Sequence, residues 1–518
     1  MTVSPVSSSS SPCLRVKRWI WLLVTFIALV GVVFLFARTM DRDLNHDEEQ
    51  FLAPAALLSR FGLQPWNDYA IFHLPNLTYL YAAADLLTGD LIYGARLVSL
   101  VATGSTLLAL AAISARKGNL PGALGAFAVV GLFLGDPLAL YTIGKAWNHE
   151  VPSALLLLAF GLLALAGKKD RLWLTALAGI FGGLAAGCRL TFAPSLIGFV
   201  LITWFFPGSV KRRLGHLAVL AVAVTLALAP SIYFFATQRE AFVFGNLEFP
   251  RLRLADAENT RIQKTVTWWR KVRHFTKEIV RPSWAIFGCW ALIAVAPGLC
   301  WLRTRKEGSQ SLAYLLLLLP FSLFGCYMPS RYQYQHCFVL IPLLAFGCAL
   351  GWPRLLRLSH YQRLTALIAV SMVGAFGWWS LARETELETV SQPGECFYSR
   401  YRSYGQEIRS HVPEGPVLTL APTFALAAGL SIYPEFSSGP FAWRSAFLVP
   451  AERRARLRLV APDDLPAFLA ARPPKAILTA VEDDELEKPI IHWAKTNGFH
   501  PVSLKKKRVL WLPADPAR

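Results

Sequence analysis

Charged residues are scarce in this chain of 518 residues: Asp, Glu, Lys and Arg together make up only 16%. A typical soluble protein has about 25%. Apolar residues account for 54% of the chain, and the mean hydropathy is +0.41. This combination excludes a soluble cytosolic enzyme, a disordered scaffold and a DNA-binding domain.

Cysteine motifs are also missing. Most of the eight cysteines lie inside apolar runs, and their spacing matches neither a metal site nor a disulfide framework. We interpret them as small packing residues.

The chain has long apolar runs instead. Eleven such runs recur, most of them close to the ~20 residues that a helix needs to cross the hydrocarbon core. They cover residues 19–37, 93–115, 120–143, 151–166, 172–188, 192–206, 214–236, 284–302, 312–328, 337–350 and 364–382. The sequence therefore predicts a polytopic α-helical membrane protein with about eleven transmembrane helices.

The formal net charge of +19 is concentrated in the short turns between these runs. Six turns hold seventeen Lys and Arg residues, opposed only by Asp170 and Glu307, and account for +15 of it. Basic residues in short loops mark the cytoplasmic side of a membrane, and alternating spans place all six turns there. The pattern predicts a cytoplasmic N-terminus and an extracytoplasmic C-terminus. It gives no indication of a nucleic-acid partner.

Three regions of different character follow from this topology. Residues 1–18 are expected to be a disordered cytoplasmic N-terminus, and residues 19–382 to form the transmembrane domain. That domain carries outer loops at 38–92 and 237–282 and a short outer turn at 144–150. The tail, 383–518, alternates strand patterns (416–420, 476–480, 509–512) with helix patterns (422–429, 463–471, 488–497). It predicts an extracytoplasmic α/β domain, without a nucleotide site because no glycine-rich fingerprint opens its first helix.

Ionisable side chains collect at the outer ends of the spans. The first outer loop opens with NHDE at 45–48, and a second Asn-His-acid pattern stands at 148–150. Amphipathic spacing at 51–61 and 77–87 predicts helices lying along the membrane surface. The candidate site residues are His46, Asp47, Glu48, His73, Lys145, His149, Glu150, Arg189, Arg331 and Tyr332.

These residues have a plain alternative interpretation as solvated carboxylates and snorkelling arginines. A cluster at a membrane boundary, however, more often marks a substrate path. A carboxylate there can take a proton from an acceptor hydroxyl, and cations can neutralise a departing phosphate. The substrate would combine a lipid tail in the bilayer with a phosphate at the interface.

Several segments together resemble the GT-C glycosyltransferases, in particular the branch with protein O-mannosyltransferases and lipid A aminoarabinose transferases. They are NHDEEQF at 45–51, FHLPNL at 72–77, NHE at 148–150, GGLA at 182–185 with Arg189, and Arg331-Tyr332 before Pro342. The basic N-terminus before one span and the outer α/β tail fit as well. The resemblance covers nearly the whole layout, although its motifs are short.

The resemblance implies transfer of a sugar from a polyprenyl phosphate to an acceptor hydroxyl, with inversion at C1. Asp47 matches the Asp of the family's Asp-Glu pair and Glu48 its neighbour, which makes Asp47 the base or orienting group. His73 stands at a basic position before Pro75. The second proline of the usual Pro-Pro is Asn76 here, which leaves the acceptor class and the donor pocket open.

Further expectations concern the ligands and the location. Arg189 and Arg331, with Lys145 or His73, would hold the departing lipid phosphate. The reaction requires no metal, and the clustered His and carboxylate groups are compatible with a divalent cation. The acceptor would be a lipid, a glycan or a protein. The layout favours a bacterial inner membrane, with the active site on the extracytoplasmic side.

Two alternatives come from other classes. A secondary transporter would place its charges at the midplane of two related halves, whereas this chain shows no internal repeat and carries its charges at one face. A large outer domain also fits a transporter poorly. A catalytically silent membrane scaffold with the same fold is the second alternative, because an intact Asp-Glu pair does not by itself establish turnover.

Overall fold

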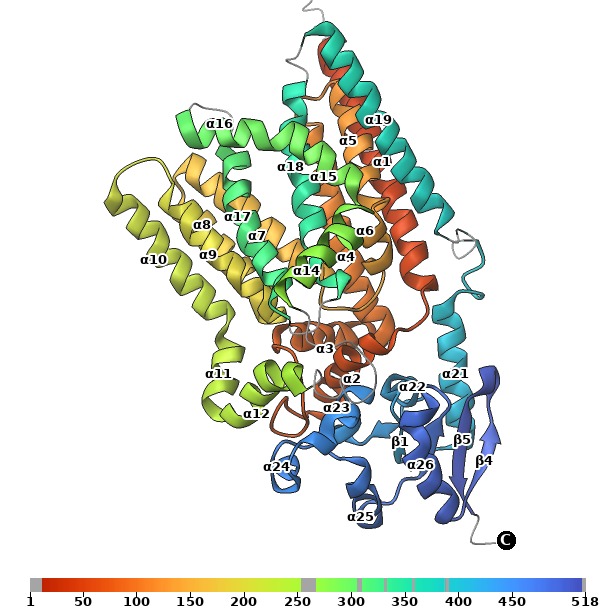
Figure 1. The fold of residues 1–518 in the computed structure, drawn as a ribbon. Helices are drawn as coiled ribbons and strands as arrows, with labels where there is room; N and C mark the ends of the chain where they lie inside the picture. The colour runs from red at the N-terminus through yellow and green to blue at the C-terminus, as the bar shows by residue number, and fades with distance from the viewer. Residues whose placement is uncertain are drawn as a thin grey trace, which may run out of the picture.

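The structure is a computed structural model that describes residues 12–252, 267–304, 310–329, 333–355, 359–385, 387 and 391–514. It has three parts arranged one below the other (Figure 1). A helical bundle forms the upper part, and two helices of the first outer loop lie beneath it. The C-terminal domain lies under those helices, at the end of the molecule opposite the start of α1.

All eleven predicted apolar runs are helical. Six helices are long and apolar enough to cross a membrane, two bent pairs pass the same test jointly, and three more apolar helices are shorter. The bundle helices are α1 (Pro12–Asp41), α4 (Leu91–Ser114), α5 (Leu120–Leu134), α7 (Glu150–Lys169), α8 (Leu172–Cys188), α9 (Ala193–Trp204), α10 (Val210–Ala227), α11 (Ala229–Thr237), α14 (Trp268–His274), α15 (Trp284–Trp290), α16 (Ala296–Thr304), α17 (Gln310–Tyr327), α18 (Leu340–Leu355) and α19 (His360–Arg383). A polytopic helical membrane fold is therefore confirmed, and the number of crossings stays a prediction.

Several predicted boundaries were wrong. Helix α1 begins at Pro12, inside the segment expected to be disordered, and residues 1–11 lie outside the described part of the chain. The run at 120–143 is two helices, because Asp136 caps a new helix, α6 (Pro137–Thr142), with Pro137 at its first position. Pro230 similarly separates α10 from α11, which meet at 59°.

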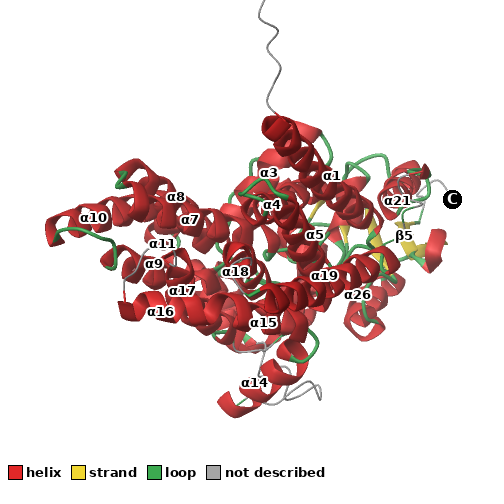
Figure 2. Cartoon of the chain, turned by 90° about the horizontal axis from the view of Figure 1, so that it is seen from above, coloured by secondary structure: helices red, strands yellow, loops and turns green. Residues whose placement is uncertain are grey.

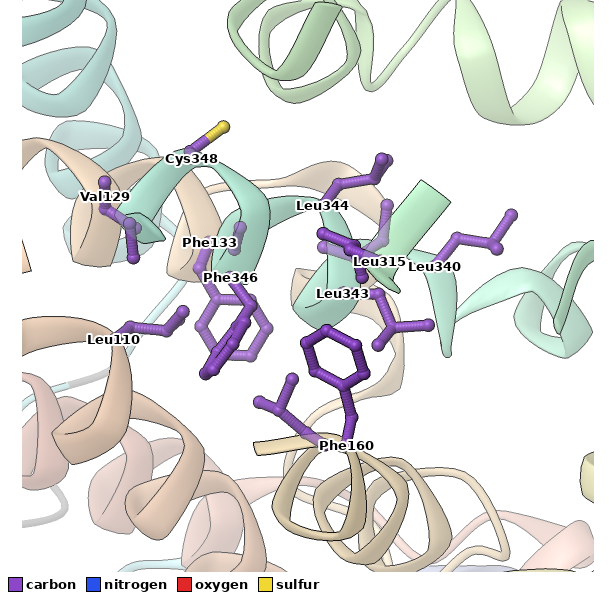
Figure 3. Close-up of a cluster of buried hydrophobic side chains, with 14 of the residues drawn as sticks. Leu110, Val129, Phe133, Phe160, Leu315, Leu340, Leu343, Leu344, Phe346 and Cys348 are labelled. Atoms are coloured by element: carbon purple, nitrogen blue, oxygen red, sulfur yellow. The ribbon is translucent and has the colours of Figure 1, made fainter. Parts of the chain in front are cut away.

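Large apolar side chains fill the centre of the bundle. Phe160 of α7 meets Phe346 of α18 edge to face, with ring centroids 5.8 Å apart, and Phe133 and Leu315 pack nearby (Figure 3). These side chains are almost wholly buried. Helix α1 by contrast exposes large apolar residues such as Phe26 along its outer face, as expected for a helix that contacts lipid.

Glycines bring α5 and α19 into close contact. A Cβ added at Gly377 would lie 2.0 Å from the carbonyl oxygen of Gly131, and one added at Gly135 would lie 2.2 Å from the Cα of Gly377. Small residues of this kind allow membrane helices to approach closely. Helix α5 lies between α1 and α19 (Figure 2). At their far ends, Arg38 of α1 donates to the backbone carbonyl of Glu384, the residue after α19.

The C-terminal domain contains a five-stranded sheet of order β2-β1-β3-β5-β4. Strands β1 (Pro416–Leu418), β2 (Ser431–Ile432) and β3 (Ala476–Thr479) are parallel, and β4 (Phe499–Ser503) and β5 (Val509–Pro513) are antiparallel to their neighbours. The predicted strands β1, β3 and β5 are present, with helices α22 (Pro422–Ala427), α25 (Leu465–Ala471) and α26 (Asp484–Thr496) near the predicted positions. Two strands were missed: β2 has two residues, and Pro501 in β4 disfavours a strand assignment.

The first outer loop contains α2 (His46–Phe61) and α3 (Asn76–Thr88). Helix α2 does not lie on the membrane surface as predicted, because residues Glu48 to Leu57 are all buried between the bundle and the C-terminal domain. The tail covers the face that the amphipathic pattern had assigned to lipid. Helix α3 does expose Leu86 and Leu87, so its contact with the membrane stays a prediction.

Glu49 joins α2 to the C-terminal domain. Its carboxylate accepts hydrogen bonds from the backbone N–H of Thr423, at 2.9 Å, and from the Thr423 hydroxyl, at 2.7 Å. Burial raises the pKa of Glu49 from an ordinary 4.5 to about 8, against the opposing effect of the Thr423 hydrogen bonds. The folded protein therefore still holds a proton here at pH values where the unfolded chain has released it.

Because the folded-state pKa of Glu49 is raised, its contribution to stability should be fully present below pH 4.5 and be lost as the pH rises through about 8. We expect Glu49→Gln, which keeps the shape of the neutral acid, to remove this part of the pH dependence. In the wild type, the free energy of unfolding should fall by about 1.4 kcal/mol for each pH unit between these two pKa values. The unfolding temperature of detergent-purified wild type and variant between pH 5 and 9 measures it. Equal slopes for the two proteins would refute this role.

Candidate active site

Glu48 fixes the start of α2. Its carboxylate forms an ion pair with Arg96 of α4, at 3.2 Å, and both side chains are 0% exposed. The backbone N–H groups of Ala146, at 2.8 Å, and Asn45, at 3.0 Å, donate to the same carboxylate. With both of its oxygens engaged by these donors, Glu48 is suited to position its surroundings.

Arg96 extends this anchor to the end of α1. Its Nη1 donates to the backbone carbonyl of Thr39, at 2.9 Å, and to that of Arg42, at 2.7 Å. The buried guanidinium of Arg96 thus fixes the end of α1 relative to α2. Through Glu48 it also fixes the turn at 144–150. Sequence reasoning missed Arg96, although an ionisable residue inside the apolar run at 93–115 was a usable signal.

Asp47 differs from its neighbour Glu48 in exposure. Its side chain is 24% exposed, and its Oδ1 lies 3.6 Å from Nε2 of His46, an exposed residue. The charge of Asp47 favours the protonated forms of both Lys145 and Arg189. A partly accessible carboxylate therefore stands within electrostatic reach of two cations from different elements.

Lys145 lies in an aromatic corner of the turn at 144–150. Its Nζ is 4.0 Å from the ring centroid of Trp147 and 4.3 Å from that of Tyr141, and the residue is only 6% exposed. It lines a cavity of about 420 Å³. Burial, and then repulsion from Arg42, lower the pKa of Lys145 from 10.5 to about 8. Such a weakly held proton makes Lys145 sensitive to pH near neutrality.

A chain of polar side chains connects α2 with the end of α8. Nε2 of His73 lies 2.8 Å from Oε1 of Gln50, and Nδ1 of His73 lies 3.4 Å from Nδ2 of Asn148. Arg189 continues the chain, since its Nη1 donates to Oδ1 of Asn148 at 3.1 Å and lies 2.6 Å from Nδ1 of His149. Burial, and then the charge of Arg189, lower the pKa of His149 well below 6.5. A neutral His149 can accept the hydrogen bond from Arg189.

The predicted residues thus divide into groups. Asp47, Glu48 and Lys145 belong to one cluster, and His73, His149 and Arg189 form the connected chain beside it. Glu150 is buried behind the turn, where its Oε1 accepts from the N–H of Gly144 and the hydroxyl of Thr103, each at 3.1 Å. Arg331 and Tyr332 lie outside the described residues.

The C-terminal domain forms one wall of a further cavity next to this cluster. The cavity has a volume of about 300 Å³ and lies between the start of α2 and the loops after β1 and β3, with His46, Glu49 and Glu482 in its lining. Burial raises the pKa of Glu482 to about 7, and the charge of Asp47 contributes to that rise. The tail domain therefore reaches the surroundings of Asp47. Within the described residues, no group of three or more His, Cys, Asp or Glu is placed to hold a metal ion.

No protein-family model matches the sequence, and no curated protein matches it either. Solved structures do match. ArnT from Cupriavidus metallidurans in the apo state superimposes with a TM-score of 0.60 and 14% identity, over 95% of this chain and 97% of that one. The same protein bound to undecaprenyl phosphate gives 0.58 and 14%, over 96% and 98%. The apo oligosaccharyltransferase of Archaeoglobus fulgidus gives 0.53 and 12%, over 96% and 76%.

These neighbours define the class of fold. The chain has the GT-C fold of polytopic membrane glycosyltransferases, and the resemblance found in its sequence is confirmed at that level. Among the structures compared, ArnT is covered almost from end to end, with the bundle and the C-terminal part both included. At 14% identity the shared property is the fold, so the activity has to be argued from the residues of this chain.

Proposed function

We propose that this protein is a membrane glycosyltransferase that moves a sugar from a polyprenyl phosphate to an acceptor hydroxyl. The observation that carries the proposal is a partly exposed carboxylate, Asp47, within electrostatic reach of a buried cation, Lys145, in the GT-C fold. The same fold is found in an ArnT structure bound to undecaprenyl phosphate. The acceptor is a lipid, a glycan or a protein.

In this mechanism Asp47 takes the proton of the acceptor hydroxyl. The acceptor oxygen forms a bond to C1 of the sugar from the face opposite the phosphate, and the bond from C1 to the phosphate oxygen breaks, which inverts C1. The lipid phosphate leaves with the electron pair. Lys145, with Arg189 as the second cation near Asp47, offsets the negative charge that develops on the phosphate.

Other residues act by positioning. Glu48 fixes the first turn of α2 and hence the place of Asp47, and Glu150 holds the turn that carries Lys145. The C-terminal domain, docked through Glu49, closes the side of the site where the acceptor would be held. The basic turns support a site on the extracytoplasmic side of a bacterial inner membrane.

The proposal is tested by transfer from labelled polyprenyl-phosphate sugars, offered as a panel to the purified protein in liposomes with total membrane lipid as acceptor. We expect one donor to yield labelled product, and empty liposomes to yield none. Uptake of a solute without any transfer would favour a transporter. No transfer from any donor to lipid, glycan or peptide acceptors would favour a silent scaffold.

The pH dependence of transfer should report Lys145. Because its pKa is about 8, the ammonium deprotonates as the pH rises past 8 and the positive charge facing the phosphate is lost. We expect transfer to fall roughly tenfold per pH unit above that value, since each unit removes about nine-tenths of the protonated form. Lys145→Arg, which stays charged and can stack on the same two rings, should move this fall by at least about one pH unit. The measurement is the initial rate of transfer between about pH 6 and 10. A fall at the same pH in the variant as in the wild type would contradict the role of Lys145.

A further inference from the structure

The cavity of about 300 Å³ beside the start of α2 lies at the edge of the C-terminal sheet where α/β domains bind ligands. Strands β1 and β3 are parallel neighbours, and β2 lies on the other side of β1. The chain therefore leaves β1 in one direction and returns on its other side to form β3. In open α/β sheets, ligands bind in the crevice outside the carboxyl ends of two such strands. Ala421 and Phe424, after β1, and Val481, Glu482 and Asp483, after β3, line the cavity.

A second wall of the cavity belongs to the first outer loop. Asn45, His46 and Glu49 contribute to it. Asp47, the proposed base, stands directly after His46, and its charge acts on Glu482 of the C-terminal domain. A molecule held in this crevice thus lies between the C-terminal domain and the residue that would take a proton from an acceptor.

Glu482 presents a carboxylate to the cavity that the protein leaves largely unsatisfied. Its side chain is only 9% exposed. Among the described residues its carboxylate accepts no hydrogen bond and forms only a long ion pair with Arg444, at 3.7 Å. The carboxylate of Glu49, by contrast, is engaged by Thr423 through both oxygens. Because a buried carboxylate without hydrogen bonds is unfavourable, Glu482 is suited to accept one from a ligand.

The loop that carries Glu482 is fixed by a buried acid. The carboxylate of Glu487 accepts hydrogen bonds from the backbone N–H groups of Ala480, at 2.5 Å, and Glu482, at 3.2 Å. Ala480 also has a φ of 61°, a conformation that costs free energy for a residue other than glycine. The fold thus holds this loop in one conformation, with the Glu482 side chain already in the lining of the cavity.

The charges around the cavity favour a cation. Its lining, as far as the structure describes it, contains the carboxyl groups of Glu49, Glu482 and Asp483 and no Lys or Arg. Burial raises the pKa of Glu482 to about 7, and a neighbouring ammonium would favour its charged form. Within the described residues, no three acidic or imidazole groups converge as a metal ion requires, whereas an ammonium needs no such convergence. A volume of about 300 Å³ is at the small end of the range for ligand sites, which suits a single sugar ring.

We propose that this crevice is the acceptor site and that it selects an acceptor carrying a primary amine near its hydroxyl, as in an amino sugar. The ammonium lies between Glu482 and Asp483, and the hydroxyl faces Asp47. The inference rests on the proposed function, which left the acceptor class open, and adds the chemistry of the acceptor. The same carboxylates repel an acceptor that bears a phosphate or a carboxylate at this position.

Binding is measured with methyl glucosaminide and the protein in nanodiscs, by saturation-transfer NMR, with no donor and no transfer required. Methyl glucoside, which has a hydroxyl in place of the amine, is the matched probe. We expect the glucosaminide to bind about tenfold more tightly, as for one hydrogen bond between charged groups, and Glu482→Gln to remove this preference. Glu485→Gln, at an exposed position of α26 where Glu485 pairs with Lys488, is the control and should keep it. Equal binding of the two probes by the wild type, or the full preference in Glu482→Gln, would overturn the inference.

A second measurement uses the wild-type protein alone. A carbodiimide activates a carboxyl group, and a bound amine then forms an amide with it and releases a urea. With methyl glucosaminide we expect mass spectrometry to find this amide at Glu482 or Asp483 in higher yield than at Asp463, an exposed acid of the same domain. Amides at Asp463 without any at Glu482 or Asp483 would overturn the inference.

A lipid headgroup is the other source of an amine at a membrane surface. Nanodiscs of phosphatidylglycerol contain no amine, and we expect added phosphatidylethanolamine to leave the binding of methyl glucosaminide unchanged. Loss of that binding would overturn the inference, because the site would then take a phospholipid headgroup.

Failure of the inference and failure of the proposed function give different results. Preferred binding and crosslinking of the glucosaminide, with no transfer from any donor, would support this site and count against the glycosyltransferase. Transfer to methyl glucoside and methyl glucosaminide with equal KM, unchanged in Glu482→Gln, would support the glycosyltransferase and overturn this site.

Discussion

Asp47→Asn should abolish transfer, with a fall of about 10²- to 10⁴-fold, the range for loss of a general base. Asparagine keeps the size of the side chain and its neighbours but cannot take a proton at neutral pH. The carboxylate it replaces is partly exposed and is placed near Lys145 and Arg189. Its neighbours Glu48 and Glu49 are buried and hydrogen-bonded, so neither is accessible to an acceptor.

The loss should appear in kcat, with donor binding nearly unchanged, because the base acts on the acceptor hydroxyl. A matched control is Asp463→Asn, the same change at an exposed site of the C-terminal domain, which should leave the rate as it is. The unfolding temperature of Asp47→Asn should equal that of wild type within a few degrees. A fully active Asp47→Asn variant would rule out Asp47 as the base and leave the fold assignment in place.

The sequence was sufficient to predict the helices, and it supplied the candidate site residues, whose roles stay predictions. A long apolar run predicts a helix, and helices lie at all eleven runs, while the number of runs that cross the membrane stays a prediction. Basic turns and the acidic start of the first outer loop likewise act locally, and they led to Asp47 and Lys145. The break inside the run at 120–143 was not predicted, because Asp136-Pro137 interrupts the helix without lowering the average hydropathy of the run much.

The contacts that could not be predicted from the sequence join residues that lie far apart in the chain. The amphipathic face of α2 looks the same whether it meets lipid or protein, and only the docking of the tail at Thr423 distinguishes the two. The pairing of Arg96 with Glu48 needs α4 and α2 to meet, and Arg38 and Arg42 share the Leu140 carbonyl because α6 meets the end of α1. No local sequence pattern predicts these contacts between helices.

Breaking the Glu48–Arg96 pair should have the largest effect on stability. Glu48→Gln leaves a wholly buried guanidinium without its counter-charge, which typically costs about 3–5 kcal/mol. Arg96→Met likewise strands the carboxylate. We expect either variant to lower the unfolding temperature of the purified protein strongly. Glu485→Gln, which breaks the exposed contact with Lys488 in α26, is the control and should cause no measurable change.

The double variant Glu48→Gln/Arg96→Met separates stability from positioning. Removing both charges together relieves the stranded charge, so much of the lost stability should return. Transfer should not return, because glutamine offers one acceptor oxygen where the Glu48 carboxylate offers two. The N–H groups of Asn45 and Ala146 are then no longer both held, and the place of Asp47 relative to Lys145 is no longer fixed. A double variant that regains both stability and transfer would show that Glu48 only balances the charge of Arg96. One that regains stability alone establishes Glu48 as the positioning residue for the base.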